Sequence, residues 1–168
     1  MEILANDLPF KLQSVPSAMY VFVRKWVKWA DIPTFFDDNL ELIAQAMTDA
    51  NTPPQYFPSI FIHKVDEQSR SSELSVAIET QKPLPILGGG TIQFPAGQAL
   101  IAQHIGSIGQ TDAIHQAMSA YVAQNDLTVG IAIEEYRDSK TTEMGDEQSE
   151  TWIIYRLYDG INIPRILC

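Results

Sequence analysis

The sequence contains little cysteine and no long apolar run. Cys168 is the single cysteine among 168 residues, so an intramolecular disulfide is excluded, which fits a reducing compartment. No apolar stretch approaches the roughly 20 residues that a membrane-spanning helix requires. The acidic start MEILANDLPFK also lacks the apolar segment of a secretory signal. We therefore expect a cytoplasmic protein without a membrane partner.

Positive charge is also scarce. Eleven Lys and Arg residues stand against 21 Asp and Glu residues, and the net charge is −10. Such a surface repels phosphates, which excludes direct nucleic-acid binding. The three histidines, His63, His104 and His115, lack metal-ligand spacing, and the glycine run at 88–90 lacks the Lys-Ser/Thr of a phosphate loop. We therefore expect neither a metal nor another cofactor.

Two segments of the chain repeat the same order of features. LQSVPSAMYVFVRKWV and TIQFPAGQALIAQHIG each place a proline, Pro16 or Pro95, before a small residue and an apolar, β-prone run. Each segment is followed by a helical pattern and two strand-like runs. This order predicts a β-α-β-β module written twice with pseudo-twofold symmetry. The expected single domain (1–168) has a first repeat at about 11–84, a linker at 85–90 and a second repeat at about 91–160.

The predicted fold class is α+β, an antiparallel sheet with the helices on one face. Pro33 suits the opening turn of the first helix, and Thr111 is a candidate cap for the second. The apolar stripes of the two helices are Phe36, Leu40, Ile43, Ala44 and Met47, and then Ile114, Ala117, Met118, Tyr121 and Val122. One helix per half covers only one face, so the other face is solvated or forms a groove where the halves meet. Such grooves commonly bind ligands.

The strand-like run TVGIAIEEY ends in two adjacent carboxylates, Glu134 and Glu135. Side chains alternate along a strand, so the two acids point to opposite faces. Glu135 follows bulky, branched residues, as a core-facing surface should, and is interpreted as a rim charge. Glu134 shares its face with small residues and with Tyr136, which leaves space for a ligand.

The run FPAGQALIAQHIGSIGQTDAIHQAMSAYVAQNDLTVGIAIEEYRDSK, with the later ETWIIYRL, resembles the gyrase-inhibitor-like (GyrI-like) effector-binding domain. That domain also occurs at the C-terminus of AraC-type and MerR-type regulators. The shared features are Pro-Ala-Gly, His-Ile-Gly, a helix, and Glu-x-Tyr at Glu134 and Tyr136. The resemblance implies an apolar, aromatic-lined pocket between the halves, with the Glu-x-Tyr glutamate facing cationic or polar groups of bulky lipophilic compounds.

Five aromatic residues are further candidates for the pocket. Trp152, on the last strand, is expected to form one wall by packing and cation–π contact. Trp26 and Trp29 lie in a basic, aromatic segment and are candidates for the pocket lip. Tyr56 and Phe57 precede the first hairpin and are candidates for the opposite wall. No catalytic residue is assigned.

Three functions remain open. The favoured one is a standalone binding domain, a sensor or sequestering protein for lipophilic small molecules, cationic ones among them, with Glu134 at the base of the pocket. Any regulation would then act through a protein partner. The second is a hydrolase of strained or electrophilic small molecules that uses Glu134 as a general base. The third is an acidic inhibitor of a gyrase-like protein partner.

Overall fold

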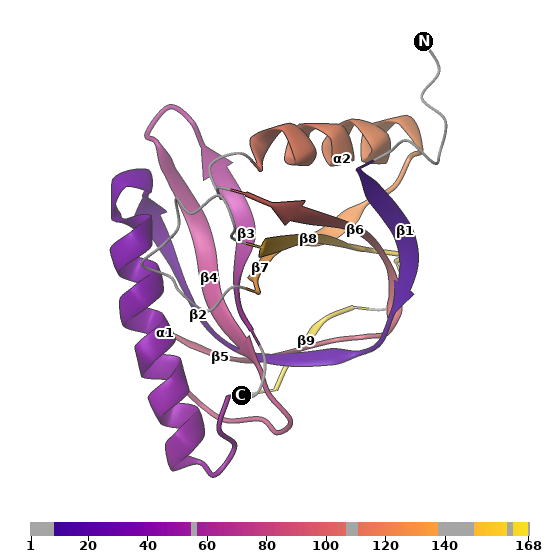
Figure 1. Cartoon of the computed structure of the whole chain (residues 1–168). Helices are drawn as coiled ribbons and strands as arrows, with labels where there is room; N and C mark the ends of the chain where they lie inside the picture. The colour runs from indigo at the N-terminus through magenta and orange to yellow at the C-terminus, as the bar shows by residue number, and fades with distance from the viewer. Residues whose placement is uncertain (1–8, 55–56, 107–110, 138–149, 161–162, 168) are drawn as a thin grey trace.

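A computed structural model of the protein describes residues 9–54, 57–106, 111–137, 150–160 and 163–167. Within them, nine strands form one antiparallel sheet in the order β1-β6-β8-β7-β3-β4-β2-β5-β9, with two α-helices (Figure 1). The strands are β1 (Phe10–Val15), β2 (Ala18–Lys28), β3 (Pro58–Asp66), β4 (Ser71–Glu79), β5 (Gly89–Phe94), β6 (Gly97–Ile105), β7 (Val129–Tyr136), β8 (Glu150–Leu157) and β9 (Arg165–Ile166). The helices are α1 (Ile32–Asp49) and α2 (Asp112–Gln124), and a 3₁₀ turn, η2 (Trp29–Asp31), precedes α1. The predicted α+β class is confirmed.

The order of the strands displays the predicted duplication. β2, α1, β3 and β4 of the first half correspond to β6, α2, β7 and β8 of the second, and the halves meet where β3 pairs with β7. Each half has one more strand than predicted, because β1 and β5 precede these elements. β5 begins at Gly89, inside the predicted linker. A Cβ at Gly89 would lie 1.7 Å from the carbonyl oxygen of Phe22, so the close pairing with β2 requires glycine there.

The two repeated prolines mark the sharpest bends of the sheet. β1 continues into β2 through Pro16, and β5 continues into β6 through Pro95. These two long segments run antiparallel, so that Val15 pairs with Gly97 before the bend and Ala18 pairs with Phe94 after it. Proline suits the bends because it has no backbone N–H to donate to a ladder. Through these bends the chain itself links the two ends of the strand order, and the sheet becomes strongly curved (Figure 1).

Arg156 of β8 holds the two bends together. One terminal nitrogen donates to the carbonyl oxygen of Pro16 at 3.1 Å, and the other donates to that of Pro95 at 3.2 Å. The guanidinium also lies 5.2 Å from the ring centre of Phe94 and hydrogen-bonds Tyr20. Burial lowers the pKa of Arg156, while the nearby Tyr20 and Glu79 oppose that shift. A partly buried cation with these partners ties the two bends of the sheet together.

Both helices cover the convex face, as predicted (Figure 1). The apolar stripe of α1 packs on β2, β3 and β4, where Phe36, Ile43 and Met47 are almost fully buried. α2 packs through Met118 on β6 and β8. Full burial of each such side chain stabilises the fold by about 1.5–3 kcal/mol.

The concave face has its own apolar core, which consists largely of aromatic rings. Tyr20, Phe61 and Phe94 meet edge to face, with ring centres 5.1 to 5.8 Å apart. Ile131 and Ile133 of β7 complete this cluster. Both faces of the sheet are therefore packed near β7, and the concave face is not simply solvated.

We predict that replacing Arg156 with Met lowers the free energy of unfolding by about 1–3 kcal/mol, because the carbonyl oxygens at both bends lose a charged donor. Urea denaturation measures the change. The control is Arg24→Met, which breaks the exposed 3.0 Å ion pair with Glu73 and should cost under about 1 kcal/mol. Equal losses in the two variants would contradict the role of Arg156 at the bends.

Candidate functional site

Glu134 lies near the end of β7, at the junction of the two halves. Its register partners are Ile60 of β3 and Ile153 of β8, which belong to the cores beneath α1 and α2 respectively. The carboxylate therefore points to the helix-bearing face of the sheet. Its side chain is 12% exposed, so the site is neither open to solvent nor sealed from it.

Three side chains can donate hydrogen bonds to the Glu134 carboxylate. The hydroxyl of Tyr136 donates to Oε2 at 2.7 Å, and His115 Nε2 lies 2.7 Å from Oε1. The hydroxyl of Thr111 donates to Oε1 at a longer 3.5 Å. Thr111 is the residue at the N-cap of α2, but its side chain makes no capping bond. The predicted cap thus contacts the carboxylate instead.

His115 connects this carboxylate to a second tyrosine. Its Nδ1 lies 2.6 Å from the hydroxyl oxygen of Tyr155 on β8. When His115 is neutral, the geometry is satisfied by Nε2–H donating to Glu134 and by the Tyr155 O–H donating to Nδ1. The result is a continuous Tyr155–His115–Glu134–Tyr136 hydrogen-bonded chain, which we call the Glu134 network.

Burial shapes the chemistry of the Glu134 network. Tyr136 is 5% exposed and packs edge to face on Phe36 of α1, with ring centres 5.4 Å apart. Burial, and then the adjacent Glu134 charge, raise the pKa of Tyr136 well above its usual value. Tyr136 therefore remains a hydrogen-bond donor to Glu134 at any ordinary pH. The arrangement can present a carboxylate to a ligand or accept a proton through Glu134.

Trp152 does not share the face of Glu134. It pairs directly with Glu135, so the strand pleat places it on the concave side. The expectation that Trp152 forms a wall beside Glu134 is therefore corrected. The indole N–H donates to Glu150 Oε1 at 2.7 Å, and the ring face contacts the Arg137 guanidinium, whose carbon lies 3.7 Å from the ring centre.

Glu135 is more than a rim charge. Its side chain is 19% exposed and accepts a 3.4 Å hydrogen bond from Arg137. Burial raises the pKa of Glu135, and Arg137 partly offsets that shift. Phe57 also lies near this guanidinium, with its ring centre 5.5 Å from the guanidinium carbon. Two predicted aromatic residues, Phe57 and Trp152, thus meet around Arg137 instead of Glu134.

Trp26 and Trp29 lie away from Glu134, at the other end of the first half. Across the sheet, Glu134 lies in line with Ile60 of β3, Val76 of β4 and Val23 of β2. Trp26 is three residues farther along β2, so its side chain points to the opposite face. Trp26 is half exposed, and the Trp29 indole donates to Ser72 at 3.0 Å. Their predicted place at the lip of a Glu134 pocket is therefore corrected. Tyr56 lies outside the described residues.

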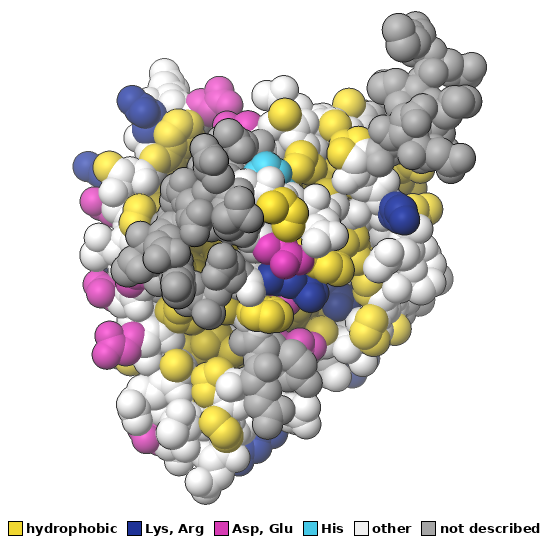
Figure 2. Space-filling view, viewed as in Figure 1, with side chains coloured by type: hydrophobic (Ala, Val, Ile, Leu, Met, Phe, Trp, Pro, Cys, Tyr) yellow, Lys and Arg dark blue, Asp and Glu magenta, His cyan; other side chains and the backbone are white. Residues whose placement is uncertain are grey.

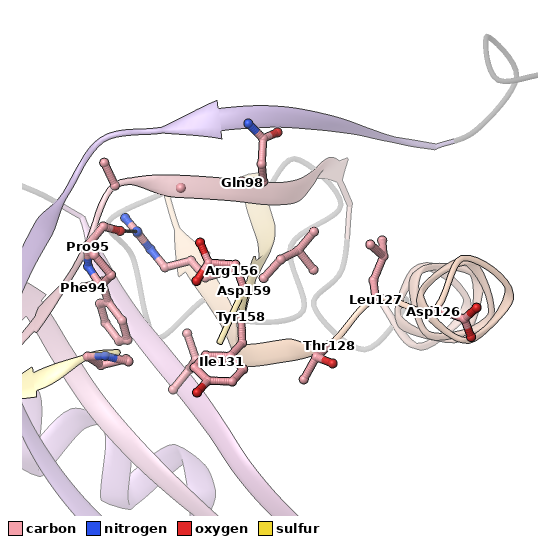
Figure 3. A pocket seen from close by; sticks show the side chains of 15 residues that line it. Phe94, Pro95, Gln98, Asp126, Leu127, Thr128, Ile131, Arg156, Tyr158 and Asp159 are labelled. Carbon is pink, nitrogen blue, oxygen red and sulfur yellow. Dashed lines mark hydrogen bonds between the residues drawn. The ribbon is translucent and has the colours of Figure 1, made fainter. Parts of the chain in front are cut away.

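The structure has a cavity of about 370 Å³ at the opposite end of β7 (Figure 3). Its lining includes Phe94, Leu127, Gly130, Arg156 and Tyr158. Gly130 lines this cavity at a break in the β7–β8 register. The open space predicted beside Glu134 is not found there, because Ala132 packs against the core beneath α2. Glu134 lines neither this cavity nor two further cavities, of about 350 and 280 Å³, in the described part of the chain.

His115, Tyr155 and Arg137 were not among the predicted site residues. Tyr155 pairs with Ala132, which shares the face of Glu134, so the β7–β8 register places Tyr155 on that face and Trp152 on the other. His115 is adjacent to Ile114 in the apolar stripe of α2, which is a usable signal for a sheet-facing position. Arg137 follows Tyr136 directly, but no sequence pattern pairs it with two rings.

The other two histidines are separate from the Glu134 network. His63 Nε2 lies 2.7 Å from the hydroxyl of Ser75, and burial lowers the pKa of His63 to about 4. His104 pairs in register with Thr151 of β8. In the described part of the chain, no group of three or more His, Cys, Asp or Glu side chains could hold a metal ion. No helix in that part is both long and apolar enough to cross a membrane.

Comparison with solved structures identifies the fold. The chain matches the EcmrR C-terminal domain with a TM-score of 0.73 at 12% identity, covering 89% of this chain and 96% of that one. It matches SAV2435 bound to tetraphenylphosphonium with a TM-score of 0.60 at 14% identity, covering 89% and 94%. A hydrolase from Listeria innocua matches with a TM-score of 0.60 at 13% identity, covering 89% and 91%. The chain therefore shares the overall fold of these three structures.

No family model and no curated protein matches the sequence. The likeness to the three structures is a likeness of fold, at identities of 12 to 14%. The side chains described above therefore carry any statement about function.

We predict that replacing Tyr136 with Phe lowers the free energy of unfolding by about 1–3 kcal/mol, because the Glu134 carboxylate loses a buried donor while ring packing is kept. Chemical denaturation followed by tryptophan fluorescence measures the change. Tyr158→Phe is the matched control, because Tyr158 is 40% exposed and should tolerate the change within about 0.5 kcal/mol. An unchanged free energy of unfolding in Tyr136→Phe would show that the Glu134 network adds nothing to stability.

Proposed function

We propose that this domain binds a lipophilic small molecule, with a preference for cationic compounds, and acts as a sensor or a sequestering protein. Glu134 is the residue that selects for positive charge, and Tyr136 orients its carboxylate. The observation that carries the proposal is the position of this carboxylate, 12% exposed and at the junction of the two halves. The bound tetraphenylphosphonium of SAV2435, a protein of the same fold, supports the choice of ligand class.

The contacts of Glu134 define what the ligand must replace. Tyr136 and Thr111 are neutral donors, and His115 lies at 2.7 Å on α2. A ligand cation that approaches Oε1 takes the place of His115, so binding requires α2 to shift at its N-terminal end. A sensor could transmit this shift of α2 to a protein partner.

Electrostatic attraction and burial of apolar surface both contribute to the proposed binding free energy. A unit-charge pair at about 4 Å contributes roughly 4 kcal/mol at an effective dielectric near 20, before desolvation is subtracted. Burial of about 200 Å² of apolar ligand surface contributes roughly 5 kcal/mol. The apolar term is the larger of the two. Shape therefore dominates affinity, and Glu134 discriminates between cationic and neutral ligands.

We expect Glu134→Gln to weaken binding of methyltriphenylphosphonium by about 10- to 100-fold, since a charge pair of a few kcal/mol is lost. Binding of the neutral triphenylphosphine oxide, which is similar in shape, should change less than about threefold. Tryptophan fluorescence titration measures both affinities.

Glu41→Gln on the exposed face of α1 removes the same charge and is the control. It should leave both affinities unchanged. Equal weakening of the cation and the neutral compound by Glu134→Gln would overturn the assignment of Glu134 as the selecting residue.

A second candidate function, hydrolysis, is favoured by the Glu134 network. A carboxylate with a histidine at 2.7 Å, itself 2.6 Å from a tyrosine hydroxyl, can accept a proton and pass one on. On an electrophilic cyclopropane, Glu134 takes a proton from water as the water oxygen bonds to a ring carbon. The ring C–C bond breaks, and its electron pair is protonated through His115. Water is thereby added across the bond.

For this candidate, we predict turnover of a cyclopropane activated by two ester groups, measured by chromatography of the ring-opened alcohol. Glu134→Gln should reduce the rate by about 100-fold or more, because the base is removed. Glu41→Gln should leave the rate unchanged. Absence of turnover by the unmodified protein, or an unchanged rate in Glu134→Gln, would exclude the hydrolase.

A further inference from the structure

One side of β2 is left without a neighbouring strand along part of its length. β2 pairs with β4 over Tyr20–Lys28, but it pairs with β5 only over Ala18–Val23. The last contact on the β5 side is a 3.1 Å hydrogen bond from the Arg24 N–H to the carbonyl oxygen of Gly88. In the described part of the chain, no strand pairs with this side of β2 beyond that point. We call the open segment, Lys25–Lys28, the β2 edge.

The β2 edge offers backbone groups to an additional strand. The N–H and C=O groups of successive residues in an antiparallel strand point alternately to its two sides. Arg24 donates toward β5, whereas Trp29 donates to the carbonyl oxygen of Arg70 at 2.9 Å on the β4 side. The N–H groups of Trp26 and Lys28 therefore point outward, together with the C=O of Trp26. Neither N–H makes a backbone hydrogen bond within the described residues.

The side chains of the β2 edge are basic and aromatic. Positions 8–30 contain no acidic residue, although the net charge of the whole chain is −10. Trp26 is 48% exposed, and Lys25 and Lys28 are exposed on either side of it. Arg24 pairs with Glu73, but Lys25 and Lys28 form no ion pair in the part of the chain that the structure describes. Basic side chains project at the upper left of Figure 2, where β2 and the β3–β4 hairpin end in Figure 1.

The pleat fixes which side chains an added strand would place opposite the β2 edge. Val27 is 6% exposed and belongs to the core beneath α1, so Lys25 shares the helix-bearing face, while Trp26 and Lys28 share the concave face. Residues directly opposite each other in an antiparallel pair lie on the same face and interact. Read from its N-terminus, an added antiparallel strand meets Lys28, Val27, Trp26 and Lys25 in turn. Its complement is an acidic residue, two apolar residues and a second acidic residue.

We propose that the β2 edge is a docking site for an extended acidic segment of a partner protein, which adds to the sheet as a strand antiparallel to β2. Backbone hydrogen bonds to Trp26 and Lys28 hold the segment, and its acidic residues pair with Lys25 and Lys28. Lysines on an open edge oppose pairing with basic or neutral strands, but they attract an acidic one. A second copy of this chain would place lysine opposite lysine, which disfavours self-pairing through the same edge.

The β2 edge is separate from the Glu134 site. Two strands, β3 and β4, lie between β7 and β2 in the sheet, which is a separation of roughly 14 Å at the usual strand spacing. Docking of a segment at the β2 edge therefore does not depend on the proposed function.

The first experiment titrates the protein into the blocked peptide Glu-Val-Tyr-Glu, labelled with fluorescein through a serine linker, and measures fluorescence anisotropy. We expect a dissociation constant of the order of 100 µM or tighter, because the strand is short. The basic peptide Lys-Val-Tyr-Lys should bind at least about tenfold more weakly. Absence of binding of the acidic peptide up to about 1 mM protein, or equal binding of the basic one, would overturn the proposal.

N-methylation of the acidic peptide tests whether it binds as a strand. In the expected register, the tyrosine N–H donates to the carbonyl oxygen of Trp26, so its methylation should weaken binding by at least about tenfold. The valine N–H points away from β2, so its methylation should change the affinity less than about threefold. Equal affinities of the two methylated peptides would indicate charge attraction without strand addition and would contradict the docking mode.

Charge reversal on the protein locates the binding. The double variant Lys25→Glu, Lys28→Glu should bind the acidic peptide at least about tenfold more weakly, and the basic peptide more tightly, than the unmodified protein does. Lys11→Glu combined with Lys82→Glu makes the same change of charge at exposed positions and should leave both affinities within about threefold. Glu134→Gln should also leave them unchanged. An equal loss in the control pair would exclude the β2 edge as the docking site.

Discussion

The pleat of β7 at the junction of the halves decides which side chains each of its two carboxylates contacts. Adjacent residues in a strand point to opposite faces, so Glu134 and Glu135 are separated by the sheet although they are neighbours in sequence. Glu134 lies beneath the helices and is satisfied by hydroxyl and imidazole groups. Glu135 lies on the concave side beside a guanidinium. One dipeptide thus provides two acidic sites with different partners.

Curvature explains why the concave side, where Glu135 lies, is partly enclosed, whereas Glu134 is covered by α2. A flat sheet with helices on one face leaves the other face open to water. Here the bends at Pro16 and Pro95 curl the sheet, and Arg156 donates to the carbonyl oxygens of both. The rings of Tyr20, Phe61 and Phe94 then meet inside the curve. The aromatic core on the concave face follows from this closure.

The sequence predicts the local structure better than the long-range contacts. Strand alternation and helical stripes predict the strands and helices, and the repeated prolines predict the duplication. These patterns can be read from residues that are close together in the chain. The place of Trp152 depends instead on its register against β7, which period-2 patterning does not fix. Thr111 is similar, because it lies at the predicted cap position but contacts Glu134, 23 residues away.

The candidate site shows the same division between local and long-range information. Glu134 and Tyr136 share a face through alternation alone, so their contact is predictable from the sequence. His115 joins them only because α2 crosses this part of the sheet, and the sequence does not give that crossing. The bending that brings Phe57 to Arg137 is likewise a property of the assembled sheet.

His115 links α2 to the sheet on the helix-bearing face. His115 is carried by α2 and contacts both Glu134 and Tyr155, which belong to the sheet. Any group that replaces it at Oε1 of Glu134 breaks a link between helix and sheet. Under the proposed function, ligand binding and movement of α2 would be coupled through this one side chain, which is the property a sensor domain needs.

The most direct test is a crystal structure of the protein with a bromobenzyl triphenylphosphonium ion, in which anomalous scattering from bromine locates the ligand. The account predicts the phosphonium beside the Glu134 carboxylate on the helix-bearing face, with His115 moved from Oε1. A cation bound elsewhere, with the contact between His115 and Glu134 intact, would contradict it.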